Sequence, residues 1–189
     1  MNKILLLIFC LVFTGLQAQR LSREEVSLIV SGRADAKMDV TLVTNSADSL
    51  LLRKKAKRIG RVDDNVHFLA KRMLETVQNP DHAGVGIAAP QVGISRRLIL
   101  VQRFDKDEKP FEAMINPVII SYSDSLCDRI EGCLSIPVIR QNVTRPYSLV
   151  LKYKTLEGKR ITEKIEGFTA RIVQHEVDHL NGILFVDYE

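Results

Sequence analysis

The chain has 189 residues, of which 46% are hydrophobic and 26% are charged, so it is long enough for one globular domain with a buried core. Its formal net charge of +4 is too small to indicate a nucleic-acid-binding protein, and we expect no DNA partner. The three cysteines, Cys10, Cys127 and Cys133, include no C-x-x-C pair, which excludes a disulfide-stabilised scaffold.

Residues 1–18 have the order of features that is typical of an export signal. Lys3 gives a short positive region, residues 4–13 form an almost unbroken apolar run, and the segment ends on a small residue. We therefore predict a signal-like leader on a protein that is made from Met1 and directed to the periplasm or cell envelope. The run is short for a membrane span, so membrane contact is expected only through this leader. Initiation at Met38 is the alternative, and it would leave the protein in the cytoplasm.

Residues 19–45 are polar and of mixed charge, and we predict them to be an N-terminal extension that precedes a folded domain at residues 46–189. A basic run follows at residues 53–58. This run could contact RNA or the ribosome, but no aromatic side chains are interleaved with it, so the sequence favours a solvated surface segment. The chain has no internal repeat or second-domain linker, and we expect a monomer.

Apolar residues recur at helical spacing from Val66 to Val77. This spacing predicts an amphipathic helix that begins near Asp63 or Asp64 and ends before Pro80. We expect its apolar stripe to face the core.

A glycine-rich stretch at residues 84–93 follows that helix. Three glycines and a proline among small apolar residues suggest a backbone that approaches another group closely. A tight buried turn explains the glycines but not Gln91, whose side-chain amide is of the kind that stabilises an oxyanion. On this stretch alone the two interpretations have equal support.

Four further segments have the apolar or alternating pattern of strands: residues 97–102, 114–120, 148–154 and 161–165. A turn at Gly158 joins the last two into a hairpin that leads directly to the last helical stretch. Short connections between strands favour an α+β fold with antiparallel sheets around that central helix.

The last helical stretch carries the pattern H-E-x-x-H at residues 175–179. Because His175 and His179 are four residues apart, their rings lie on the same helix face and can bind one metal ion. Glu176 lies about 100° round the helix, where its carboxylate can take a proton from a water molecule beside the metal. A merely polar helix face explains the pattern less well, because the neighbouring residues are apolar and buried charged groups need partners. Gly182 is expected to end the helix.

A catalytic site of this type takes three protein ligands, so the two histidines need one more. Cys133 is the candidate, because it lies in a glycine-containing turn that a proline bounds. Either Cys133 or Cys127 could instead be a small buried hydrophobic residue, as most free cysteines are. That explanation fits Cys127 better than Cys133. Only the glycine-containing turn around Cys133 favours this cysteine as the ligand.

Three motifs together resemble the signature motifs of the peptide deformylase family and stand in the same order. They are Gly84-Val85-Gly86-Ile87-Ala88-Ala89-Pro90-Gln91, Glu131-Gly132-Cys133-Leu134-Ser135 and Gln174-His175-Glu176-Val177-Asp178-His179. The resemblance covers residues 46–189. Many metallohydrolases share H-E-x-x-H, whereas the three motifs together are highly specific.

The resemblance implies a metal-dependent hydrolase that removes the formyl group from N-formylmethionine at the N-terminus of newly made polypeptides or peptides. It implies ferrous iron, which zinc, nickel or cobalt can replace. The matching positions give the metal and catalytic set: Cys133, His175 and His179 as ligands, Glu176 as acid/base, and Gln91 with the backbone N–H of Leu134 for the formyl oxygen. Four further positions would contact the substrate: Gly84 and Gly86 beside the peptide, and Phe168 and Ile172 around the methionine side chain.

Three alternatives remain open at this point. A zinc endopeptidase would usually need a third ligand downstream, and residues 180–189 contain no histidine. A cysteine hydrolase that pairs Cys133 with His175 would be active without metal. An exported deformylase-like protein that binds metal or peptide ends without turnover would have little need of Glu176 and Gln91.

Overall fold

The computed structural model describes residues 20–188, so the predicted leader lies outside the described residues. The α-helices are α1 (Arg23–Ile29), α2 (Ser46–Leu52), α3 (Asp64–Val77) and α4 (Gly167–Asn181). The strands are β1 (Gly86–Ala88), β2 (Leu98–Gln102), β3 (Phe111–Tyr122), β4 (Leu126–Cys133), β5 (Ile136–Pro146), β6 (Ser148–Lys154) and β7 (Arg160–Glu166). Short 3-10 helices lie at η1 (Pro80–His82), η2 (Ala89–Val92) and η3 (Phe185–Asp187).

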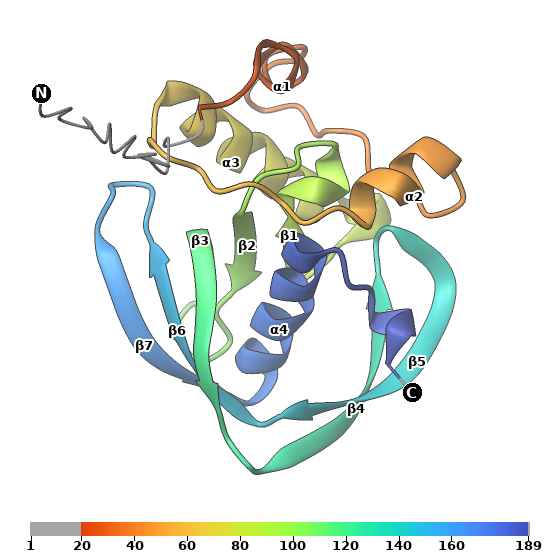
Figure 1. Cartoon of the computed structure of the whole chain (residues 1–189), viewed down its shortest axis with the longest axis vertical. Helices are drawn as coiled ribbons and strands as arrows, with labels where there is room; N and C mark the ends of the chain where they lie inside the picture. Colours follow the sequence, from red (N-terminus) through yellow and green to blue (C-terminus); the bar gives the residue numbers. More distant parts are fainter. Residues whose placement is uncertain (1–19, 189) are drawn as a thin grey trace, which may run out of the picture.

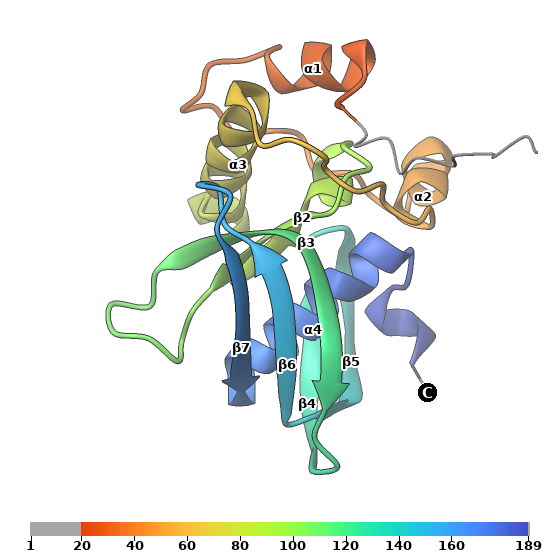
Figure 2. The same ribbon diagram turned by 60° about the vertical axis from the view of Figure 1, so that its left-hand side comes forward.

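The strands form a five-stranded sheet of order β1-β2-β3-β6-β7 and a separate two-stranded sheet β4-β5. All strand pairings within the two sheets are antiparallel. Helix α4 lies between the two sheets, and helices α1, α2 and α3 gather at one end of the molecule (Figure 1). Strands β3, β6 and β7 lie in front of α4 when the molecule is turned (Figure 2). The predicted α+β fold with antiparallel sheets around the H-E-x-x-H helix is confirmed.

Helix α3 is the helix that apolar spacing predicts. Its N-cap is Asp63, whose side chain accepts a hydrogen bond from the backbone N–H of Val66 at 3.2 Å. Its apolar face packs into one core cluster with residues of β2, including the fully buried Leu69 and Leu98. A second cluster lies between the five-stranded sheet and α4. Helix α3 therefore covers one face of the sheet around β2 and α4 covers the other. The packing against the sheet holds α4 in a fixed place.

Helix α4 ends where the sequence predicts. Gly182 has φ +77°, a left-handed conformation that side chains with a Cβ rarely adopt. A Cβ at this position would also meet the carbonyl oxygen of Arg53 at 2.3 Å, so the glycine permits the chain to pass close to the loop after α2.

The predicted extension, residues 19–45, is packed against the folded domain from residue 20 onward. The side chain of Ile29 at the end of α1 is fully buried in the same core cluster as α3. The guanidinium of Arg72, a buried residue of α3, donates hydrogen bonds to four carbonyl oxygens of this segment: those of Leu28, Ile29, Ala36 and Lys37. Glu25 forms an ion pair with the buried Arg96 at 2.6 Å. Backbone carbonyls and one carboxylate supply much of its binding, so this segment is held although its composition is polar.

The four predicted strands correspond to β2, β3, β6 and β7. The hairpin of β4 and β5 was not expected, because its residues alternate poorly: most of β4 is exposed, and Glu131 is its buried residue. Within residues 20–188, no helix combines the length and the apolar character needed to cross a membrane.

Candidate metal centre

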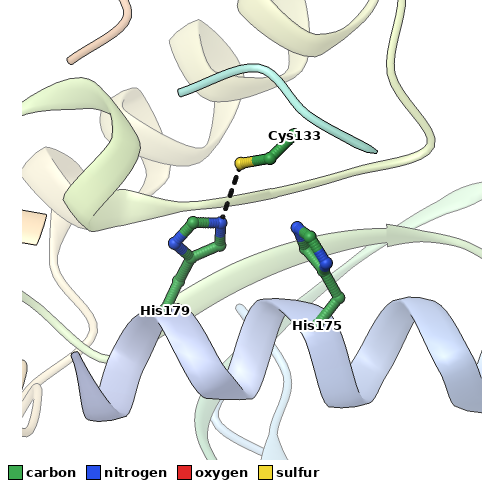
Figure 3. Close-up of side chains that lie close together, drawn as sticks. All are labelled: Cys133, His175 and His179. Atoms are coloured by element: carbon green, nitrogen blue, oxygen red, sulfur yellow. Dashed lines mark hydrogen bonds between the residues drawn. The ribbon is translucent and has the colours of Figure 1, made fainter. Parts of the chain in front are cut away.

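Three side chains, two from α4 and one from β4, converge on one face of α4. His175 and His179 lie one turn apart on the helix, and Cys133 ends strand β4. Their potential ligand atoms all lie within 4.8 Å of one another, and the sulfur of Cys133 is 3.2 Å from Nε2 of His179 (Figure 3). This is the spacing that a thiolate and two imidazoles need to reach one ion.

The ring of His175 is held by Glu131. Nδ1 of His175 donates to Oε2 of Glu131 at 3.0 Å, because a carboxylate can only accept, and this leaves Nε2 available to a metal. Glu131 is held in turn by two arginines: Nε of Arg145 at 2.7 Å and Nη1 of Arg171 at 2.6 Å, both to Oε1. Burial would raise the pKa of Glu131, but its hydrogen bonds to His175 and Arg145 lower it to about 2.

The electrostatics of the three residues fit a bound cation. Burial alone would lower the pKa of His175, but its hydrogen bonds to Cys133 and Glu131 raise it to about 10. The hydrogen-bond partners of His175 therefore favour a proton on its ring. A divalent cation can take the place of that proton, because metal ligands bind in their deprotonated forms. The donor set of one thiolate and two imidazoles suits ions such as zinc and iron rather than magnesium or calcium.

Glu176 lies beside the three potential ligands and is only 4% exposed. Burial raises the pKa of its carboxyl group to about 7, and the charge of Glu131 acts in the same direction, against the opposing effect of His175. Among the described residues, Oε2 of Glu176 has no hydrogen-bond partner. A Cβ at Gly86 would come within 2.6 Å of Oε1 of Glu176, so the glycine lets β1 pass directly over the carboxylate. A buried carboxyl group with this pKa can exchange a proton near neutral pH.

Gln91 lies in η2 and is 2% exposed. Its Oε1 accepts from the backbone N–H of Ala88 at 2.8 Å, which fixes the orientation of the amide. Its Nε2 then points toward the centre, at 3.3 Å from both the sulfur of Cys133 and Oγ of Ser135. Leu134 follows Cys133 directly and lines the same pocket. The structure thus brings Gln91 and Leu134 together with the three potential ligands and Glu176.

A pocket of about 300 Å³ opens onto this centre. The four residues expected to contact the substrate, Gly84, Gly86, Phe168 and Ile172, all line it. The ring of Phe168 packs on that of Phe104 at a centroid distance of 5.0 Å, and the guanidinium of Arg129 lies over it at 4.4 Å. Contacts with Phe104 and Arg129 therefore hold the ring of Phe168 in place in the pocket wall.

Comparison with known proteins identifies the family. The family model described as polypeptide deformylase matches residues 40–188. The chain belongs to the polypeptide deformylase family. The curated peptide deformylase of Synechocystis sp. is 46% identical over 138 residues, which is 72% of this chain and 73% of that protein. A deformylase of this family is a metal-dependent amidohydrolase that removes the N-formyl group from nascent polypeptides, and this is the activity of the chain.

Solved deformylase structures share the fold. A Met-Ala-Ser-bound class I type b peptide deformylase from Acinetobacter baumannii superposes with a TM-score of 0.73 at 37% identity, over 82% of this chain and 99% of that chain. A peptide deformylase from Synechococcus elongatus in complex with actinonin gives a TM-score of 0.71 at 39% identity, over 80% and 78% of the two chains.

Some residues around the deformylase site were not expected from sequence. Glu131 stands in the second motif, and its place two residues before Cys133 was the available signal for its contact with His175. Arg145 and Arg171 carry no such signal, because only the folded hairpin brings them to Glu131. The expectation that Cys127 is a small buried residue was wrong: it is exposed, because β4 turns most of its side chains to solvent.

Proposed function

We propose that the chain hydrolyses N-formylmethionine at the N-terminus of polypeptides with ferrous iron held by Cys133, His175 and His179. Zinc, nickel and cobalt are the proposed substitutes. A centre with one thiolate and two imidazoles supports this choice, because such donors accept several first-row metals and availability then decides which is bound. When bound, the metal supplies Lewis acidity that polarises the formyl group and makes a water molecule acidic.

In this proposal Glu176 moves the protons. Its carboxylate takes a proton from the attacking water and later delivers it to the amine that leaves. Its burial and its pKa of about 7 support both steps, because a group of this pKa gives up and takes a proton with similar ease. Nε2 of Gln91 and the backbone N–H of Leu134 donate hydrogen bonds to the formyl oxygen as negative charge develops on it.

The substrate is proposed to lie along the free edge of β1. This strand ends the five-stranded sheet, so a peptide can add to it as a further strand beside Gly84 and Gly86. The methionine side chain would then enter the pocket between Phe168 and Ile172. The Met-Ala-Ser-bound relative supports a peptide ligand, and another relative is in complex with actinonin.

The proposal rests mainly on the buried carboxylate of Glu176 beside three converging potential metal ligands, with its Oε2 lacking a hydrogen-bond partner among residues 20–188. The test is formate release from a formyl-Met-Ala-Ser peptide by purified protein under anaerobic conditions. Activity should disappear with a chelator and return with ferrous iron, and zinc, nickel and cobalt should each be compared at equal occupancy. Activity that survives complete metal removal would instead indicate a cysteine hydrolase. Full metal occupancy without any formate release would indicate a binding protein.

We also propose that the protein is made from Met1 and acts in the cell envelope on formylated peptides that have left the ribosome. The order of charge, apolar run and small residue in residues 1–18 supports export. A start at Met38 would remove α1 and the carbonyl groups that Arg72 binds, which supports a start before this segment. N-terminal sequencing of the native protein together with cell fractionation tests the proposal. A cytoplasmic protein that begins at Met38 would refute it.

A further inference from the structure

A second hollow of about 670 Å³ adjoins the pocket of the metal centre. The two share four wall residues: Ala83, Cys133, Leu134 and Arg140. The other wall residues used below are Lys37, Met38, Asp39, Asp81 and Val138. We call this hollow the downstream groove.

The edge of β1 leads from the metal centre to the downstream groove. Gly86 lies against Glu176, Gly84 is two residues earlier, and Ala83, which comes next, lines both hollows. A peptide cannot extend along β1 in the opposite direction, past Ala88, because Ala88 is fully buried and its N–H donates a hydrogen bond to Oε1 of Gln91. A strand added to this edge with its reacting end at Glu176 therefore extends toward the groove.

One wall of the groove comes from the N-terminal extension. Lys37, Met38 and Asp39 precede residue 40, where the match to the family begins. The wall is fixed in place: the backbone N–H of Met38 donates to Oγ1 of Thr76 at 2.9 Å, and the carbonyl of Lys37 accepts from Arg72 at 3.1 Å. The Met38 side chain is 5% exposed. This part of the groove is thus a built surface that precedes the residues matched by the family model.

The groove has a mixed chemical character. Lys37 and Arg140 bring positive charge, while Asp39 and Asp81 bring negative charge, and Lys37 lies 3.9 Å from Asp81. Val138 presents an apolar surface that is 95% exposed and is held with φ +75°, an unusual conformation for a β-branched residue. Walls of both signs with apolar contacts suit a polypeptide of mixed sequence and do not suit a uniformly charged polymer.

We propose that the downstream groove binds the part of the substrate polypeptide that follows the formylmethionine and its immediate neighbours. The proposal rests on the proposed function, since it takes the peptide path along β1 as its starting point. It assigns to Lys37 and Asp39 a role in choosing substrates by length and by charge. The occupant is a polypeptide because the groove continues the hollow in which the formylated end is held.

The test compares formyl peptides of three and eight residues that share their first three residues. For the unchanged chain, kcat/KM should be roughly threefold to tenfold higher for the longer peptide, mainly through KM, which is the range expected of partly exposed contacts. Exchanging the two charges, Lys37→Glu with Asp39→Lys, should bring this ratio close to one. The matched control, Lys55→Glu with Asp107→Lys, changes exposed residues outside the groove and should keep the ratio.

A second measurement separates this proposal from the proposed function. Calorimetric binding of the unformylated three- and eight-residue products requires no turnover, and it should show the same length preference and the same loss in the charge-exchanged chain. Product binding that depends on length without formate release would contradict the proposed function and keep the groove. A ratio near one in the unchanged chain, or a ratio that the charge exchange leaves intact, would overturn the groove. Sedimentation experiments give a third outcome that would overturn the groove. If the unchanged chain is a dimer and the charge-exchanged chain is a monomer, the groove binds a second copy of the chain and not the substrate.

Discussion

The buried carboxyl group of Glu176 should reduce the stability of the metal-free protein at neutral and alkaline pH. In the unfolded chain this group ionises near pH 4.5, and in the folded chain burial raises its pKa to about 7. Below pH 4.5 the group is protonated in both states and has no effect. As the pH rises through 7 the folded state must hold a buried charge, and the full difference corresponds to about 3 kcal/mol.

Replacing Glu176→Gln removes this ionisation. We expect the metal-free variant to be more stable than the metal-free parent by about 3 kcal/mol at pH 8 and by only about 1 kcal/mol at pH 5. Urea unfolding of both proteins at the two pH values, with the slopes compared, measures the difference. The matched control is Glu131→Gln, where the sign is opposite: the folded pKa is lowered to about 2, so the ionised group stabilises the protein at both pH values.

Equal stability of the parent and Glu176→Gln at pH 8, or a difference that does not change with pH, would show that burial does not raise the pKa of Glu176. A stabilising effect at the position that handles protons would show that the site is built for reactivity at a cost in stability.

Three further predictions concern the ligands, the metal and the extension. Cys133→Ser should lower metal content and formate release, whereas Cys127→Ser should change neither; metal analysis decides, and equal losses would overturn the ligand assignment. Air should inactivate the iron form faster than a nickel form, because a ferrous centre with a thiolate can be oxidised; residual activity over time measures this, and identical decay would contradict it. A chain that starts at Met38 leaves Arg72 without four carbonyl partners, so its free energy of unfolding in urea should be several kcal/mol lower than that of the full chain. An unchanged free energy of unfolding would mean that the extension does not stabilise the domain.

The sequence predicted those parts of the molecule whose signals are local. The spacing of two histidines, a helix cap at Asp63 and a stop at Gly182 depend on residues within a few positions of one another. Both ends of α3 and the C-terminal end of α4 therefore agree closely with the prediction. The third ligand was harder. Cys133 lies 42 positions before His175, and on residues alone only its glycine-containing turn distinguished it from Cys127.

The remaining features depend on contacts between distant segments. Strands β4 and β5 pair mainly with each other and leave much of their surface in water, so they lack the alternation that marks a strand. The extension is polar in composition, yet Arg72 and Arg96 bind it from positions more than 30 residues away. The two arginines on Glu131 likewise meet it only after the hairpin folds against α4.

The central claim is that this chain is a deformylase in which Glu176 transfers protons and does not hold the metal. The most direct measurement is formate release by Glu176→Ala and by the parent chain, each loaded with the same metal and analysed for metal content. We expect equal metal content in the two proteins and a loss of nearly all turnover in the variant. Loss of the metal from the variant, or substantial formate release by the metal-loaded variant, would contradict the central claim.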